Sequence, residues 1–97
     1  MKDYSIGVNN KYMIEYHCRV CGLYMEEPPW GKDNRTPSYD ICPCCGMEFG
    51  FEDYKLDLVR QYRQQWIDRG AEWFEKKEKP SNWDLTVQMK NIPKEWL

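Results

Sequence analysis

Four of the five cysteines are arranged in two pairs, and this arrangement restricts the fold more than any other feature of the sequence. Within each pair two residues separate the cysteines, and twenty residues separate the pairs. The pairs are Cys18 with Cys21 and Cys42 with Cys45. A C-x2-C spacing lets the chain turn tightly enough to direct both sulfurs at one ion, and two such pairs are typical of a zinc site. The sequence therefore predicts that all four cysteines bind one metal ion.

A glycine follows each pair, and the two segments form a weak internal repeat. Cys-Arg-Val-Cys-Gly-Leu at 18–23 matches Cys-Pro-Cys-Cys-Gly-Met at 42–47, at an offset of 24 residues. Gly22 and Gly46 can adopt positive φ, which lets backbone N–H groups approach the sulfurs and spread the thiolate charge. Four cysteines complete a tetrahedron and leave no open position. We therefore expect a structural Zn2+, with Fe in the same site as the alternative.

The cysteine count also bears on the compartment. Five cysteines would leave one unpaired in a disulfide framework, which argues against a secreted scaffold. Residues 1–12 contain no apolar run that resembles a signal peptide, and no stretch reaches membrane-spanning length. We expect a cytoplasmic protein in a reducing compartment, where clustered cysteines usually hold metal, and no contact with a membrane.

The charge balance disfavours nucleic acid as a partner. The formal net charge is -2, and four thiolates with one Zn2+ would add about -2 more. Proteins that bind nucleic acids usually carry a basic face. The short lysine run at 76–79 is interleaved with glutamate, which is typical of an exposed helix end.

The chain has 97 residues, a length that predicts one domain. Residues 1–10 form a loose lead-in. Residues 11–17 and 38–41 are expected to be strands because they are rich in aromatic and β-branched residues. The segment between the cysteine pairs is rich in Pro, Gly, Asn and Asp, and predicts a loop. The predicted domain 1–97 thus contains a cysteine ribbon at 11–53 and a helical tail at 54–97 packed on it.

The tail has a helical pattern over residues 54–69, which Asp53 would cap and Gly70 would end. The apolar face of this helix is formed by Leu56, Val59, Trp66 and Ile67. A last short helix is predicted after position 81 or 82, up to Pro93. The amphipathic helix predicted at 54–69 would be only marginally stable in water on its own. We therefore expect its apolar face to pack on the ribbon.

Four further side chains each have two interpretations. Arg63 lies on the apolar face, where a buried ion pair is favoured over a partner-binding arginine. Trp30 is either an exposed recognition residue in a Pro-rich loop or part of the core. Cys44 is expected to be a free thiol near the surface, and a redox-sensing or spare ligand is the alternative. His17 precedes Cys18 on an extended segment, points to the opposite face and is not expected to bind the ion.

The segments around both pairs resemble the two knuckles of rubredoxin-like zinc ribbons. The run Ile-Cys-Pro-Cys-Cys-Gly at 41–46 is also similar to the bacterial cysteine-rich CPCC proteins. The resemblance covers residues 11–53. It implies a rubredoxin-like zinc ribbon of short antiparallel strands with two cysteine knuckles. Together with the helical pattern that follows, we expect a small α+β fold in which this ribbon precedes a C-terminal helix and a short helical tail.

No set of residues in the sequence forms an evident catalytic constellation. We therefore predict a non-enzymatic zinc-binding protein whose four-cysteine site supports a protein-interaction module, with another protein as its partner. Three alternatives stay open. They are an inhibitor or immunity protein against a basic bacterial toxin, a rubredoxin-type electron carrier with iron, and a nucleic-acid-binding zinc ribbon.

Overall fold

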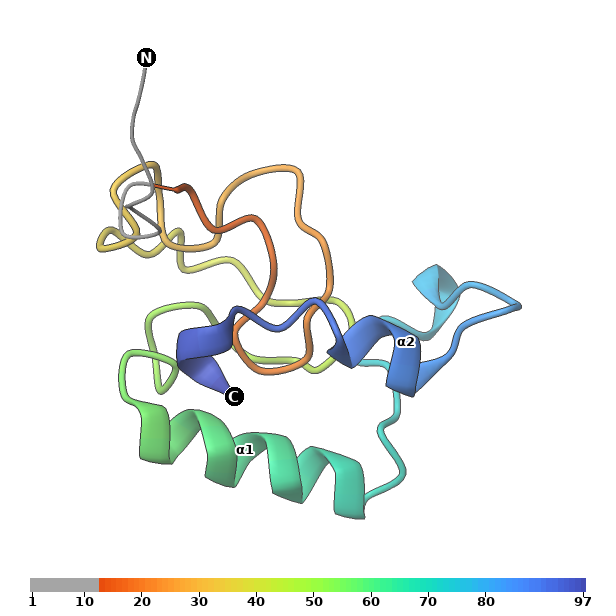
Figure 1. Cartoon of the computed structure of the whole chain (residues 1–97). Coiled ribbons are helices and arrows are strands. Elements are labelled where there is room, and N and C mark those ends of the chain that lie inside the picture. Colours follow the sequence, from red (N-terminus) through yellow and green to blue (C-terminus); the bar gives the residue numbers. More distant parts are fainter. Residues whose placement is uncertain (1–12) are drawn as a thin grey trace.

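The computed structural model describes residues 13–97. Its elements are the helix α1 (Leu56–Asp68), the 3-10 turn η3 (Lys76–Glu78), the short helix α2 (Leu85–Met89) and the 3-10 turn η4 (Lys94–Trp96). In Figure 1, α1 runs along one side of the molecule and the irregular loops that precede it pack above it. The turn η4 and the helix α2 lie on the same side of α1 as those loops. The expected lead-in at 1–10 and the first two residues of the expected strand 11–17 lie outside the described residues.

The predicted ribbon of antiparallel strands is wrong. Residues 13–97 contain no strand, only two isolated antiparallel bridges, His17 with Tyr24 and Ile41 with Glu48. Each cysteine turn reverses the chain, so a bridge forms directly outside it. Pairing does not extend from the first bridge into a ladder, and farther from it the Glu15 N–H donates to Asn34 Oδ1 at 2.9 Å and not to a neighbouring strand. A small α+β fold built on a rubredoxin-like strand ribbon is therefore not what residues 13–97 form.

The internal repeat of the sequence recurs as a repeat in space. The two bridges are related by the same offset of 24 residues as the sequence repeat. In each copy the glycine N–H donates to the carbonyl of the first cysteine, at 2.9 Å from Gly22 to Cys18 and at 2.9 Å from Gly46 to Cys42. The φ angles of the two glycines are 84° and 82°. We call the two copies the first knuckle, residues 17–24, and the second knuckle, residues 41–48.

The helix α1 buries the face that the sequence predicts. Val59 and Trp66 are buried, Leu56 and Ile67 are half-buried, and the opposite polar face is exposed. The core that receives this face combines the knuckles with residues on both sides of α1. Its buried members are Cys18, Val20, Cys21, Cys42, Cys44, Cys45, Met47, Phe49, Val59, Trp66, Ala71 and Trp73. The helix therefore packs on a core made largely of knuckle residues.

The predicted cap of α1 is wrong, because Asp53 has another role. The helix begins after Lys55, which makes no side-chain capping bond. Asp53 is fully buried and its carboxylate accepts hydrogen bonds from the Gly50 N–H at 2.6 Å and from the Trp30 indole at 2.9 Å. A buried carboxylate needs such donors to offset lost hydration. Asp53 thus closes the loop before α1 instead of starting the helix.

A last short helix is present as predicted, but it covers only Leu85–Met89 and ends before Ile92. It forms α2, and the Asp84 side chain caps it by accepting from the Val87 N–H at 3.0 Å. Ile92 follows the helix and is buried. Neither α1 nor α2, the two α-helices in the described part of the chain, is long and apolar enough to cross a membrane.

Candidate metal centre

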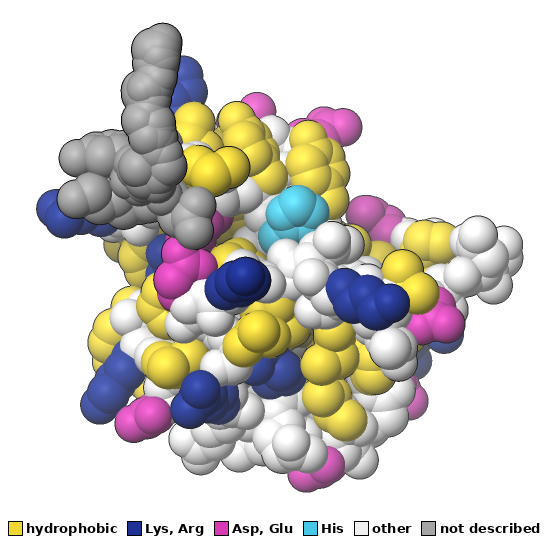
Figure 2. Space-filling view, viewed as in Figure 1, with side chains coloured by type: hydrophobic (Ala, Val, Ile, Leu, Met, Phe, Trp, Pro, Cys, Tyr) yellow, Lys and Arg dark blue, Asp and Glu magenta, His cyan; other side chains and the backbone are white. Residues whose placement is uncertain are grey.

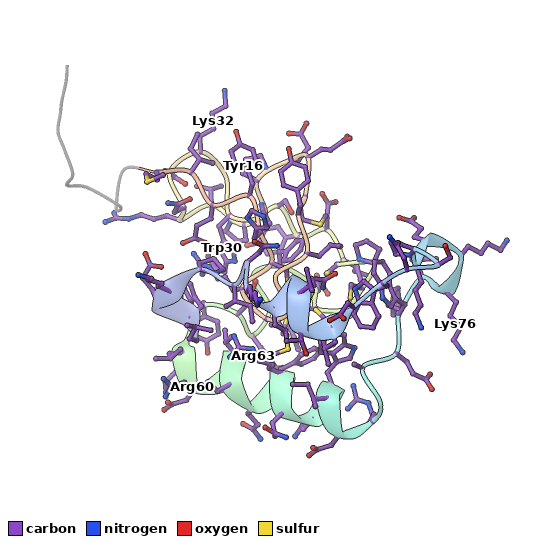
Figure 3. The ribbon with its side chains drawn as sticks, turned by 45° about the vertical axis from the view of Figure 1, so that its right-hand side comes forward. Tyr16, Trp30, Lys32, Arg60, Arg63 and Lys76 are labelled. Atoms are coloured by element: carbon purple, nitrogen blue, oxygen red, sulfur yellow. The ribbon has the colours of Figure 1, made fainter. Side chains whose placement is uncertain are left out.

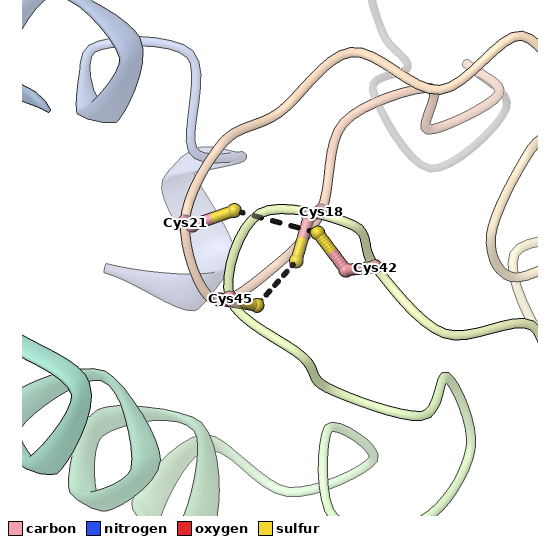
Figure 4. A group of neighbouring side chains, drawn as sticks. All are labelled: Cys18, Cys21, Cys42 and Cys45. Atoms are coloured by element: carbon pink, nitrogen blue, oxygen red, sulfur yellow. Dashed lines mark hydrogen bonds between the residues drawn. The ribbon is translucent and has the colours of Figure 1, made fainter. Parts of the chain in front are cut away.

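The four paired cysteines converge on one point inside the molecule (Figure 4). All are buried, and their sulfurs lie within 4.8 Å of one another. The closest contacts cross between the knuckles, at 3.7 Å from Cys18 Sγ to Cys45 Sγ and at 3.7 Å from Cys21 Sγ to Cys42 Sγ. A tetrahedron with Zn–S bonds of about 2.3 Å has sulfur–sulfur edges of about 3.8 Å. The four cysteines are thus positioned to hold a metal ion, and that ion would join the two knuckles.

The local backbone supports this arrangement. The Val20 N–H donates to Cys18 Sγ at 3.4 Å, which is the kind of contact that spreads thiolate charge. A Cβ at Gly22 would lie 2.5 Å from the Gln88 carbonyl oxygen, so the positive φ and the close approach of α2 both require glycine there.

Burial determines how the thiols behave before a metal binds. It raises the pKa of the Cys21 and Cys45 thiols well above the usual value, because a thiolate loses its hydration inside the core. Four thiolates with one divalent ion would carry a net charge of about -2. A cation is therefore the group that can hold all four sulfurs in their ionised form at this site, and binding would release protons.

Three successive backbone carbonyls of the first knuckle, at residues 19–21, accept hydrogen bonds from side chains of the tail. The Arg63 guanidinium donates from Nε to the Val20 carbonyl at 2.7 Å and from Nη2 to the Arg19 carbonyl at 2.8 Å. The same guanidinium also donates to the Trp96 carbonyl. Figure 3 shows Arg63 between α1 and the loops that it holds. Gln88 completes the set by donating to the Cys21 carbonyl at 3.1 Å.

The second knuckle has its equivalent carbonyls satisfied by different donors. The backbone N–H groups of Glu75 and Phe74 donate to the carbonyls of Pro43 at 2.8 Å and Cys44 at 2.9 Å. The Tyr62 hydroxyl donates to the Cys45 carbonyl at 2.9 Å. Burial and the charge of Cys45 raise the pKa of Tyr62 to about 12, so this hydroxyl keeps its proton at neutral pH. Three successive carbonyls in each knuckle are therefore bound by groups from the tail.

The predicted ion pair of Arg63 is wrong. Among residues 13–97 no carboxylate pairs with Arg63, whose partners are backbone carbonyls. The two ion pairs in that part of the chain join other side chains, Arg19 with Glu15 and Lys76 with Glu72. A guanidinium has several donors in a rigid fork, which suits adjacent carbonyls of a tight turn.

Arg19 has a structural role that the sequence does not reveal. Its guanidinium lies between the rings of Trp30 and Trp96, at 4.1 Å from the centre of each. It also pairs with Glu15 at 2.9 Å and donates to the Asp53 carbonyl at 2.9 Å. Trp30 is buried in this stack, so its interpretation as an exposed recognition residue is wrong. No spacing rule connects positions 19, 30 and 96.

Cys44 is fully buried, and its predicted place near the surface is wrong. The internal repeat explains its position, because Cys44 is the equivalent of the buried Val20 in the first knuckle. Its sulfur accepts from Gln88 Nε2 at 3.3 Å and lies outside the set of four converging cysteines. His17 is also outside that set and packs edge-on against Tyr24.

We expect Cys44→Val to keep a full metal content and to change the free energy of unfolding by less than about 1 kcal/mol. The reason is that valine already fills the equivalent position of the first knuckle, and a swap of similar volume is tolerated in a core. Metal analysis and urea denaturation of the purified variant measure both quantities. Loss of metal from Cys44→Val, with retention in Cys42→Val, would show that Cys44 is the ligand instead of Cys42.

The fold and the site define a small cysteine-rich protein whose four paired cysteines are positioned to hold a metal ion. The chain is similar to the uncharacterized protein YoaQ of Bacillus subtilis (strain 168), at 35% identity over 60% of this chain and 64% of that protein. It is also similar to the uncharacterized protein YozI of the same strain, at 32% identity over 57% of this chain and 59% of that protein. The chain thus spans about three fifths of the length of these relatives.

No family model matches the chain, so neither the rubredoxin-like nor the CPCC resemblance is confirmed. No solved structure matches it either.

Proposed function

We propose that the chain is a non-enzymatic protein-interaction module that is held together by one structural Zn2+ on Cys18, Cys21, Cys42 and Cys45. The convergence of four buried sulfurs at near-tetrahedral spacing carries this proposal. With all four positions taken by cysteines, the ion has no open position at which a water or substrate could react. The metal then serves to join the knuckles, and the groups that bind the knuckle carbonyls extend its effect to the tail.

The exposed surface supports the interaction part of the proposal. Several large apolar side chains of the described residues are exposed, and they include Tyr24, Tyr39, Ile41, Phe51, Tyr54 and Phe74. More than half of the surface of Phe74 is exposed. In Figure 2, hydrophobic side chains are interspersed with charged ones on the face that is shown. Aromatic residues in a charged surround are common in surfaces that bind proteins.

Elemental analysis tests the metal. Protein purified from zinc-replete cells is expected to contain about one zinc per chain and little iron, because a closed four-thiolate site suits a structural zinc ion. A stoichiometric iron content with a colour that bleaches on reduction would contradict the proposal and favour electron transfer.

Affinity capture from the lysate of the source cells tests the interaction. The zinc-loaded chain should retain a defined partner protein, and Cys21→Ser should lose that partner because its knuckle cannot form. Capture by both forms alike would contradict the role of the metal-bound fold.

A further inference from the structure

An open groove lies where residues 23–27, at the end of the first knuckle and after it, meet Pro43 of the second knuckle and the segment around η3. Its volume is about 440 Å3. It is lined by Leu23, Tyr24, Met25, Glu26, Glu27, Asp40, Pro43, Trp73, Glu78 and Pro80. Residues 23–27 and Pro43 contribute one part of the lining, and Trp73, Glu78 and Pro80, from the segment around η3, contribute the other. We call it the acidic groove.

The floor and the rim of the acidic groove differ in chemistry. Buried Trp73 and half-buried Leu23, Met25 and Pro43 supply apolar surface. The charged residues of the lining are all acidic and exposed: Glu26, Glu27, Asp40 and Glu78. None of these four carboxylates forms an ion pair within residues 13–97.

Two of the three lysines at 76–79 have partners outside this rim. Lys79 directs its ammonium toward the ring of Trp83, at 5.4 Å from the ring centre, and Lys76 lies 3.9 Å from Glu72. A loaded metal site would add about two negative charges close by, since Pro43 lies between two ligands of the second knuckle. The groove therefore combines an apolar floor with a rim whose charged lining residues are all acidic.

The spacing of the carboxylates argues against a single bound cation. Within residues 13–97 the four-cysteine cluster is the only group of three or more side chains close enough to share one ion. Acidic groups spread along a groove instead match several positive charges spread along a chain. A nucleic acid would place phosphates against these carboxylates and be repelled.

We propose that the acidic groove binds an extended segment of a partner protein in which lysine or arginine alternates with apolar residues. The basic side chains would face the carboxylates of the rim, and the apolar side chains would pack on the floor around Trp73. The inference rests on the proposed interaction function and names the chemistry of the partner. The floor brings together residues 23–25, 43 and 73, so the groove exists only where both knuckles and the tail are folded.

A peptide-binding measurement tests the acidic groove. The probe is a fluorescein-labelled nonapeptide of alternating lysine and leucine, and its anisotropy is measured with the zinc-loaded full chain. The triple variant Glu26→Gln, Glu27→Gln, Asp40→Asn should weaken binding about tenfold, since three exposed charge contacts of about 0.5 kcal/mol each amount to that factor. The variant should still fold, because its three side chains are exposed.

A matched control separates the groove from net charge. The triple variant Glu52→Gln, Asp57→Asn, Glu95→Gln removes the same charge from positions outside the lining and should change binding by less than about twofold. A peptide of alternating glutamate and leucine should not bind. Equal weakening by both triple variants, or no binding of the lysine peptide to the zinc-loaded chain, would overturn the proposal.

The outcomes also distinguish this proposal from the broader one. If the groove variant keeps its zinc and still captures the same lysate partner as the unmodified chain, the acidic groove is not the binding surface although the interaction module stands. If the zinc-loaded chain captures no partner from the lysate, the proposed function fails, and the peptide assay on the same zinc-loaded sample still decides whether the groove binds basic segments.

Discussion

Removal of the metal with a strong chelator is expected to melt α1 together with the knuckles. The buried face of α1 packs on a core made largely of knuckle residues, and a helix of 13 residues is marginal in water without such packing. Binding of a structural zinc ion contributes about 10–16 kcal/mol to the folding of small domains. The whole free energy of unfolding of a domain is of similar size, so we expect loss of the ion to unfold this one. Far-ultraviolet circular dichroism with and without chelator measures the helical signal.

Two variants make this experiment specific. Cys21→Ser should reproduce the spectrum of the chelated protein without any chelator, and Cys44→Val should behave as the unmodified chain does, because its sulfur is outside the converging set. A helical signal and melting curve that survive complete metal removal would show that the tail folds independently of the knuckles. The prediction of one domain over 1–97 would then have to be dropped.

Arg63→Met should lower the free energy of unfolding of the zinc-loaded protein by about 3 kcal/mol or more. The substitution leaves the carbonyls of Arg19, Val20 and Trp96 without their donor, and each buried group that loses its partner costs about 1–3 kcal/mol. Methionine fills similar space, so the loss reports on the hydrogen bonds more than on packing. Urea denaturation measures it.

Arg60→Met is the matched control on the same helix. Arg60 is exposed and donates one bond, to the Leu97 carbonyl at 2.7 Å, so its replacement should cost less than about 1 kcal/mol. Arg63→Lys should lie between the two, because an ammonium cannot span the carbonyls that the guanidinium fork reaches. Equal losses for Arg63→Met and Arg60→Met would show that water satisfies the knuckle carbonyls.

The parts of the fold that depend on local spacing could be predicted from the sequence. The two C-x2-C pairs fix which sulfurs meet, and the 24-residue repeat recurs in the two bridges and the two glycine turns. The buried face of α1 follows from helical periodicity at Val59 and Trp66. These signals are short-range, so no tertiary contact is needed to recognise them.

The strands were predicted from residue type, and this failed for a physical reason. Aromatic and β-branched residues favour a strand only where a neighbouring strand can pair with them over several residues. Here the cysteine turns bring the chain together at single bridges, and beyond the first bridge the Glu15 N–H binds the Asn34 side chain. The stack of Arg19 with Trp30 and Trp96 joins three distant segments, and nothing in the spacing of those positions indicates that they meet.

The two knuckles place unequal constraints on how the sequence can vary over time. Phe74 and Glu75 bind the second knuckle through backbone N–H groups, which every residue except proline provides, so many residue types can occupy these positions without loss of the bonds. The first knuckle instead depends on the side chains of Arg63 and Gln88. Sequences that share this fold can therefore drift at 74 and 75, whereas position 63 has to stay an arginine unless another donor reaches the same carbonyls.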